Sequence, residues 1–282
     1  MKIRAGYDIA FETAGPTAMT LLLNVRPERQ HDLVTPERIV FDPPVPSRSH
    51  LDAFGNVATR IVAPGGPIRM SADFVIRDTG RHDDCALGAE QHAVADLPDD
   101  VLPFLLGSRY CDTDKLSDIA WSLFGSGPEG GERVQSIVDY AHNRLRFDYQ
   151  LADSTRSAFE AHTQQVGVCR DFAHLAITLC RCMNIPARYA TGYLGDIGVP
   201  KDPAPMDFSA WFEAYLGGRW YTFDARHNRP RIGRIVMARG RDATDCALTT
   251  SFGSALLTRF EVHTDEVEGD EAAEPVPLAI AA

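Results

Sequence analysis

One segment near the middle of the chain restricts the fold more than any other. It runs from Gly167 to Pro186, and apolar residues occur on nearly every side of a helix drawn over it. A helix that is apolar all round has to be buried in a protein core. Gly167 breaks the chain before this helix, and Asn184 followed by Pro186 ends it. The sequence therefore predicts a central helix that other elements cover.

Cys169 lies in the first turn of this predicted helix. The free backbone N–H groups and the helix dipole at that end stabilise an anion, so a thiolate there has a lowered pKa and can act as a nucleophile. The same N–H groups can bind an oxyanion. The ordinary alternative is a packed core cysteine. His174, about 140° round the helix from Cys169, is expected to be a hydrogen-bonded core histidine.

A β-hairpin is predicted downstream of the helix, because two aromatic-rich runs flank a pair of glycines. A two-residue turn fixes the register, so that residue 211 faces 224 and residue 209 faces 226. In this register Ser209 lies diagonally beside Asp224, within reach of a side-chain contact. His227 then falls opposite Phe208, on the other face of the hairpin.

The order of the remaining patterns predicts an α+β protein in four parts. Residues 1–80 carry alternating runs typical of a sandwich or partial barrel, at 3–11, 18–25, 37–41, 57–63 and 68–76. We expect a connecting region at 81–130 with helical pieces near 99–106 and 114–124, and an acidic, disordered tail at 265–282. The core, 131–264, is expected to hold a helix at 132–146, a polar loop at 150–165, and strands at 187–194 and 255–263. The arginines between 226 and 241 are expected in a solvated loop or paired with the acidic surface.

Charge and composition exclude several classes of function. The net charge of −11 repels a phosphate backbone or an anionic membrane, so neither nucleic acid nor membrane is an expected partner. No signal peptide and no apolar run long enough to span a membrane are found, which predicts a soluble, cytoplasmic protein. The six cysteines match no zinc spacing, and five of them are expected to be buried. No acidic loop has EF-hand spacing, and no metal or cofactor is expected.

Three motifs stand out in the chain: GVCRDFAHL, NIPARYATGY and AWFEAYLGGRWYTFD. Together they resemble the transglutaminase-like (papain-like cysteine) superfamily, in its bacterial branch. The resemblance covers residues 130–262, and the β-rich first part is similar to an N-terminal domain that often precedes such a core. It implies a central helix packed on an antiparallel sheet.

The resemblance also implies roles for individual residues. Cys169 matches the family's nucleophile, Asp224 the acid that orients the base, and Trp211 a residue that binds substrate. The base should be a histidine at position 209, where this chain has Ser209. A serine hydroxyl is not basic near neutral pH, so it cannot take the thiol proton.

Three interpretations of Ser209 stay open. In the first, a turn or bulge after Asp224 redirects His227, which replaces the missing base. In the second, the protein is a pseudoenzyme that keeps the fold as a protein- or peptide-binding module. In the third, the serine was introduced to inactivate the protein. We favour the first, and predict an enzyme that attacks peptide or glutamine-type amides through a thioester, as a peptidase, amidase or acyltransferase, without a cofactor.

Overall fold

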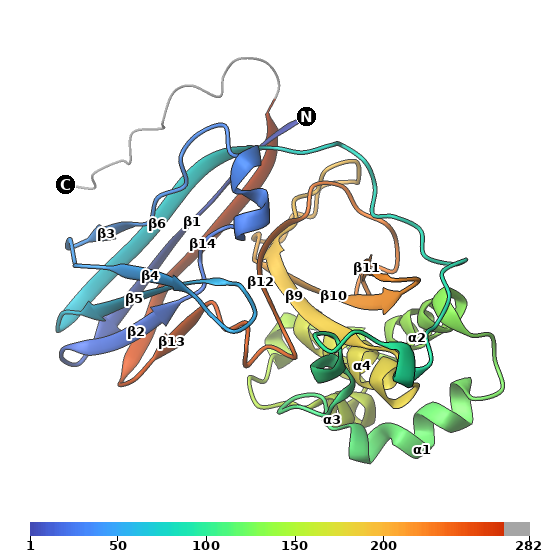
Figure 1. The fold of residues 1–282 in the computed structure, drawn as a ribbon. Helices are drawn as coiled ribbons and strands as arrows, with labels where there is room; N and C mark the ends of the chain where they lie inside the picture. The colour runs from blue at the N-terminus through green and yellow to red at the C-terminus, as the bar shows by residue number, and fades with distance from the viewer. Residues whose placement is uncertain (268–282) are drawn as a thin grey trace.

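The first of two lobes is a sandwich of two four-stranded sheets, in a computed structural model that describes residues 1–267 (Figure 1). The sheets have the orders β14-β1-β6-β3 and β13-β2-β5-β4. Inward-facing residues of both sheets meet in one apolar core. The strands are β1 (Lys2–Thr13), β2 (Thr17–Leu21), β3 (Val40–Asp42), β4 (Arg48–Leu51), β5 (Val57–Ala63), β6 (Gly66–Arg77), β13 (Thr249–Ser251) and β14 (Ala255–Val267). The predicted N-terminal sandwich is confirmed, although β4 was not foreseen.

The end of the chain completes this first lobe. Strand β14 pairs with β1 along its whole length, and β13 pairs with β2. The sequence had placed the strand at 255–263 in the core part, 131–264, but its hydrogen bonds put it in the N-terminal sheet. An alternating pattern predicts that a segment is an extended strand, but it does not predict which other strand the segment pairs with. The tail predicted from residue 265 begins as the end of β14, and residues 268–282 lie outside the described residues.

The second lobe packs helices on a sheet of order β11-β10-β9-β12 (Figure 1). Helix α4 (Cys169–Cys182) is central, and all its residues except Arg170 are buried. It packs against the sheet and against the three other α-helices of residues 1–267. The elements are α1 (Thr113–Phe124), α2 (Gly130–Arg144), α3 (Ala158–Gln164), β9 (Ala187–Tyr193), β10 (Ser209–Leu216), β11 (Arg219–Phe223) and β12 (Ile235–Gly240), with short parallel strands β7 (Arg146–Phe147) and β8 (Val166–Gly167). The predicted buried helix on an antiparallel sheet is confirmed.

Short 3-10 helices fill several connections. They are η1 (Pro27–Asp32), η2 (Val94–Asp96), η3 (Leu102–Leu105) and η4 (Tyr149–Leu151). Helix α3 lies inside the segment 150–165 that was expected to be a loop. Ser157 accepts a hydrogen bond from the backbone N–H of Glu160, whose carboxylate accepts one from the N–H of Ser157. This Ser-x-x-Glu capping box is a signal that could have predicted the helix from the sequence.

The cysteines follow the prediction with one exception. All six are free, and Cys111, Cys180, Cys182 and Cys246 are buried as expected. Cys85 is exposed instead. Across residues 1–267, no helix combines the length and the apolar composition that a membrane crossing requires.

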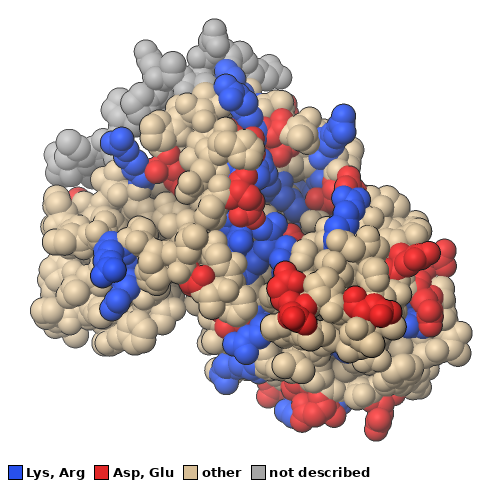
Figure 2. Space-filling model, viewed as in Figure 1, with Lys and Arg blue, Asp and Glu red and all other residues tan. Residues whose placement is uncertain are grey.

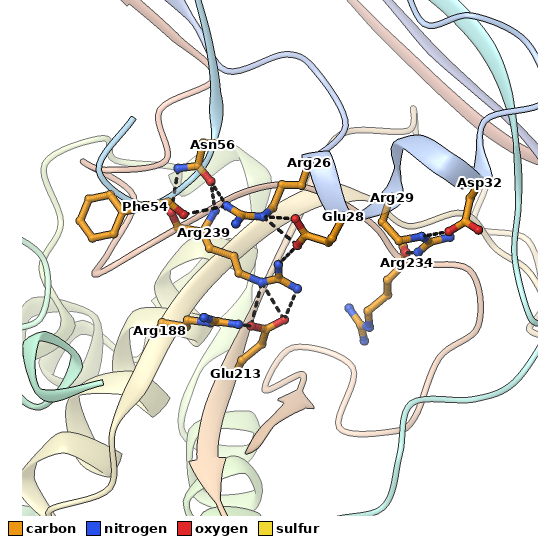
Figure 3. A network of polar contacts seen from close by, with 10 residues as sticks. All are labelled: Arg26, Glu28, Arg29, Asp32, Phe54, Asn56, Arg188, Glu213, Arg234 and Arg239. Carbon is orange, nitrogen blue, oxygen red and sulfur yellow. Dashed lines mark hydrogen bonds and ion pairs between the residues drawn. The ribbon is translucent and has the colours of Figure 1, made fainter. Parts of the chain in front are cut away.

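A polar network joins the two lobes around Glu213 of β10 (Figure 3). The Glu213 carboxylate accepts hydrogen bonds from Arg188 of β9 and Arg239 of β12, at 2.6 and 2.9 Å. Arg239 also bonds Glu28 of η1, and its backbone N–H donates to Asn56 beside β5. Figure 2 shows basic side chains gathered between the lobes on this face.

The arginines between 226 and 241 differ in their surroundings, since Arg229 and Arg241 are exposed and the others are half-buried or buried. Arg231 and Arg234 are 3% and 8% exposed, and Arg234 and Arg239 pair with buried or half-buried carboxylates. The expected pairing with carboxylates is found for Arg231, Arg234, Arg239 and Arg241, whereas Arg229 is exposed, as expected of a solvated loop.

The first lobe contains a carboxyl group with a pH-dependent effect on stability. Glu37 accepts hydrogen bonds from the backbone N–H of Val25 and from Asn24, but burial raises its pKa to about 7. Between the unfolded pKa and pH 7, the folded protein therefore holds a proton that the unfolded chain releases. Stability from this group is present below about pH 4 and is lost as the pH rises through 7.

Glu37→Gln should remove this pH dependence. Glutamine keeps the acceptor oxygen and does not titrate in either state. Between pH 4.5 and 7.5 the wild type should lose up to about 3 kcal/mol of unfolding free energy more than Glu37→Gln does. Urea denaturation across this range measures the difference. If the unfolding free energies of the two proteins changed in parallel with pH, the prediction would be contradicted.

Candidate active site

Cys169 is held at the start of α4 by a buried ion pair. The Asp171 carboxylate accepts a hydrogen bond from the backbone N–H of Val168, at 2.9 Å, just before the helix. Arg156 donates to the same carboxylate at 3.2 Å, and both side chains are almost fully buried. These contacts fix the first turn, where Cys169 is 9% exposed.

The Cys169 thiol does not have the lowered pKa expected from its place on the helix. Burial raises its pKa to about 11, and the negative charge of Asp207 acts in the same direction. Arg226 and the backbone N–H groups of Ala210 and Arg170 lower it, but by less than burial raises it. At neutral pH the thiol is therefore protonated and needs a base to become a nucleophile.

Asp224 and His227 form a hydrogen-bonded pair. Strand pairing in the hairpin stops at residues 212 and 223, so the predicted pairing of residues 209 and 226 does not form. The chain turns after Asp224 instead, and its carboxylate accepts from the backbone N–H of His227 at 2.9 Å. Its other oxygen lies 2.9 Å from Nδ1 of the His227 imidazole. The turn thus moves His227 away from the position opposite Phe208.

Asp224 is ionised in this environment. It is 5% exposed, and burial would raise its pKa, but the charge of Arg234 and the hydrogen bonds from His227 outweigh burial and hold the pKa well below its usual range. Arg234 donates to the carboxylate at 2.9 Å. An ionised carboxylate on Nδ1 leaves Nε2 of the imidazole as the nitrogen that can accept a proton.

A cavity of about 80 Å³ lies beside His227. His227 and Ser209 both line it, together with Asp207 and Arg226, the two side chains whose charges act on the Cys169 thiol. Arg226 lies over the ring of Phe147, 3.8 Å from its centre. The remaining lining residues are Tyr149, Leu194, Asp196, Asp202, Ala204, Pro205, Met206 and Arg231.

Comparisons with known proteins identify the family of this chain. The description "Transglutaminase-like superfamily" matches residues 119–225. A crystal structure from Cytophaga hutchinsonii, named "Putative Cysteine Protease", is 34% identical with a TM-score of 0.82, over 96% of this chain and 92% of that one. The chain belongs to the transglutaminase-like superfamily. The "Uncharacterized protein ML0607" of Mycobacterium leprae (strain TN) is 26% identical over 74% of this chain and 77% of that protein.

Position 209 of this transglutaminase-like protein makes no hydrogen bond to Asp224 among the described residues. Ser209 is 7% exposed and pairs with Gly192 of β9, and no hydrogen bond joins it to Asp224 within the described residues. Strand β11 ends at Phe223, just before Asp224, so the ladder that would set residues 209 and 224 in register stops short of them. Asp224 bonds His227 and Arg234 instead.

Trp211 does not reach the cavity. It is 1% exposed, packs with Ala190 and Val236, and has the Arg234 guanidinium 4.8 Å from the centre of its ring. A direct contact with substrate, as predicted, would require this ring to be uncovered. In the present structure Trp211 supports Arg234.

His174 is the core histidine that the sequence predicted. It is fully buried, it stacks on Tyr110, and its Nε2 accepts a hydrogen bond from the backbone N–H of Ala243 at 3.1 Å. Burial lowers its pKa far below the usual value. Within residues 1–267, no three His, Cys, Asp or Glu side chains are grouped to hold a metal ion.

The sequence interpretation missed Arg226, Arg234 and Asp207 as parts of this site. Arg226 directly precedes His227 in the turn, so its place follows once that turn is recognised. Asp207 precedes the strand that starts at Ser209. The bond of Arg234 to Asp83 has no local signal, because Asp83 is far away in the sequence.

Proposed function

We propose that this transglutaminase-like protein is a cysteine-nucleophile enzyme that acts on peptide or glutamine-type amides, with His227 as its base. The observation that carries the proposal is the 2.9 Å contact between Nδ1 of His227 and the Asp224 carboxylate. This contact gives the imidazole the orienting acid that a Cys–His–Asp arrangement requires. The shared cavity with Ser209, Asp207 and Arg226 supports it, because the last two act on the Cys169 thiol.

The reaction begins with proton transfer. The Cys169 thiol gives its proton to Nε2 of His227, and the sulfur bonds to the carbonyl carbon of the amide. Backbone N–H groups at the start of α4 stabilise the oxyanion. The C–N bond then breaks, and the imidazolium returns its proton to the leaving nitrogen. A thioester on Cys169 remains.

The second half of the reaction releases the acyl group. Water or an amine attacks the thioester carbon and gives a proton to His227. The C–S bond breaks, and the sulfur takes this proton back. Water gives a peptidase or amidase, and an amine gives acyl transfer. A protein or peptide is the substrate in either case.

A second candidate function is a catalytically silent protein- or peptide-binding module. It is favoured by the burial of Cys169, which raises the thiol pKa to about 11 and opposes ionisation. The two functions differ in whether the protein lowers the barrier to thiolate formation at neutral pH.

The pH dependence of Cys169 alkylation distinguishes them. Iodoacetamide is added between pH 5 and 10, and modification of Cys169 is followed by peptide mass spectrometry, which separates it from the exposed Cys85. An enzyme should show Cys169 modified well below pH 8, and Cys169→Ala supplies the background. Modification only in alkali, as for a buried thiol without a base, would favour the binding module. Ser209→His is a companion variant, and it should raise the reactivity at neutral pH if position 209 is a lapsed base site.

A further inference from the structure

Arg234 lies between two carboxylates that come from different parts of the chain. Its Nη2 donates to Asp224 at 2.9 Å, and its Nε donates to Asp83 at 2.9 Å. Asp83 belongs to the segment that connects the two lobes, and Arg234 directly precedes β12. One guanidinium thus links the connecting segment to the carboxylate that bonds His227.

The position of Arg234 is fixed on several sides. Its side chain is 6% exposed and lies over the Trp211 ring. Asp83 is fixed too, because its carboxylate accepts from the backbone N–H of Arg231 and its own N–H donates to the carbonyl of Arg231, both at 2.9 Å. A planar guanidinium can hold two carboxylates at set angles, which a single ammonium cannot do.

We propose that Arg234, held by Asp83, is a positioning residue that keeps Asp224 ionised and directed at Nδ1 of His227. This inference rests on the proposed function, because it gives the Asp224–His227 pair a part in thiol activation. The family match ends at residue 225, so neither Arg234 nor His227 falls within it. The connecting segment is then part of the active-site support rather than a linker alone.

The burial of Asp224 explains why a cation is needed at the position of Arg234. Asp224 is buried, and an unpaired buried carboxyl group takes up a proton. The charged or titratable groups that act on it are Arg234, His227 and, more weakly, Arg231, while Asp83 acts on Arg234. Among them, Arg234 makes the largest contribution that holds the Asp224 pKa low. A protonated Asp224 could no longer orient the imidazole as a base.

The test compares the pH profile of Cys169 alkylation by iodoacetamide in the full chain. In Arg234→Met, the rate at pH 7 should fall at least about ten-fold, and the acid midpoint of the profile should move up by about one pH unit or more. In Arg234→Lys, the charge remains but the two-carboxylate bridge is lost, so the rate should fall about three-fold or more with little change in midpoint.

Arg239→Met is the matched control. Arg239 also bridges two carboxylates, Glu213 and Glu28, but it lies in the network between the lobes. The Arg239→Met variant should lower the melting temperature as Arg234→Met does, but it should leave the acid midpoint of the alkylation profile unchanged. A purely structural role for Arg234 would give the two methionine variants the same profile, and this result would overturn the proposal.

Two further outcomes separate this inference from the proposed function. If Arg234→Met does not fold, Arg234→Lys decides, and a wild-type alkylation rate in that variant overturns the positioning role. His227→Gln is measured in parallel. If it leaves the rate unchanged, the proposed function itself fails. If His227→Gln slows alkylation while the folded Arg234 variants do not, only the positioning role fails.

Discussion

His227→Gln should lower the rate of Cys169 alkylation at pH 7 by about 10²-fold, and the rate of amide cleavage by about 10²- to 10⁴-fold. The thiol is protonated at this pH because burial raises its pKa to about 11. Glutamine still fills the space beside Asp224, but it cannot accept the thiol proton. The loss should therefore be one of reactivity, with little change in stability.

Two control variants test whether the loss of reactivity is specific to His227. Ser209→Ala should change the rate by less than about three-fold, because a hydroxyl is not a base near pH 7. His92→Gln removes another imidazole, whose Nε2 accepts from Gly218 at the far end of the hairpin, and should have no effect. A loss in Ser209→Ala as large as that in His227→Gln would contradict the assignment of the base.

The turn that contains His227 could not be predicted from the hairpin pattern. The two-glycine turn predicts the hairpin register correctly as far as residues 212 and 223. Beyond them, the Asp224 side chain bonds the N–H of His227, and such a local bond competes with the strand ladder. Aspartate is common in turns. The residue at which strand pairing ends and the turn begins depends on packing with the rest of the protein, and the hairpin pattern carries no information about that packing.

Long-range pairing explains the other differences. The pattern of α4 predicts its burial because every turn of the helix is apolar. The arginines of β12 and of the loop before it carry no such signal, since their partners are distant in the sequence. Arg234 and Asp83 are 151 residues apart, and Arg239 and Glu28 are 211 apart. The pKa of Cys169 also depends on distant residues. The effect of the helix end, which lowers the pKa, follows from the local sequence, but the burial that raises the pKa comes from packing of the whole lobe.

Glu213→Gln should give the largest loss of stability among the predicted variants. Glu213 is 4% exposed and pairs with Arg188 and Arg239, so its removal leaves two largely buried cations without their shared partner (Figure 3). Breaking a buried ion pair from one side costs about 3–5 kcal/mol. Glu28, on the outer side of Arg239, has a side chain that is 44% exposed. Glu28→Gln should therefore cost less than about 1 kcal/mol.

The pH dependence of this loss identifies its cause. Burial would raise the Glu213 pKa, but Arg239 and Arg188 outweigh burial and lower it. A carboxylate with a lowered pKa stabilises the fold above its unfolded pKa, and this stabilisation is lost as the pH falls through the folded value. Urea denaturation should show a full deficit in Glu213→Gln at pH 7 that narrows below about pH 4. A deficit that stays constant in acid would assign the loss to packing or hydrogen-bond geometry rather than to the two arginines left without a charge partner.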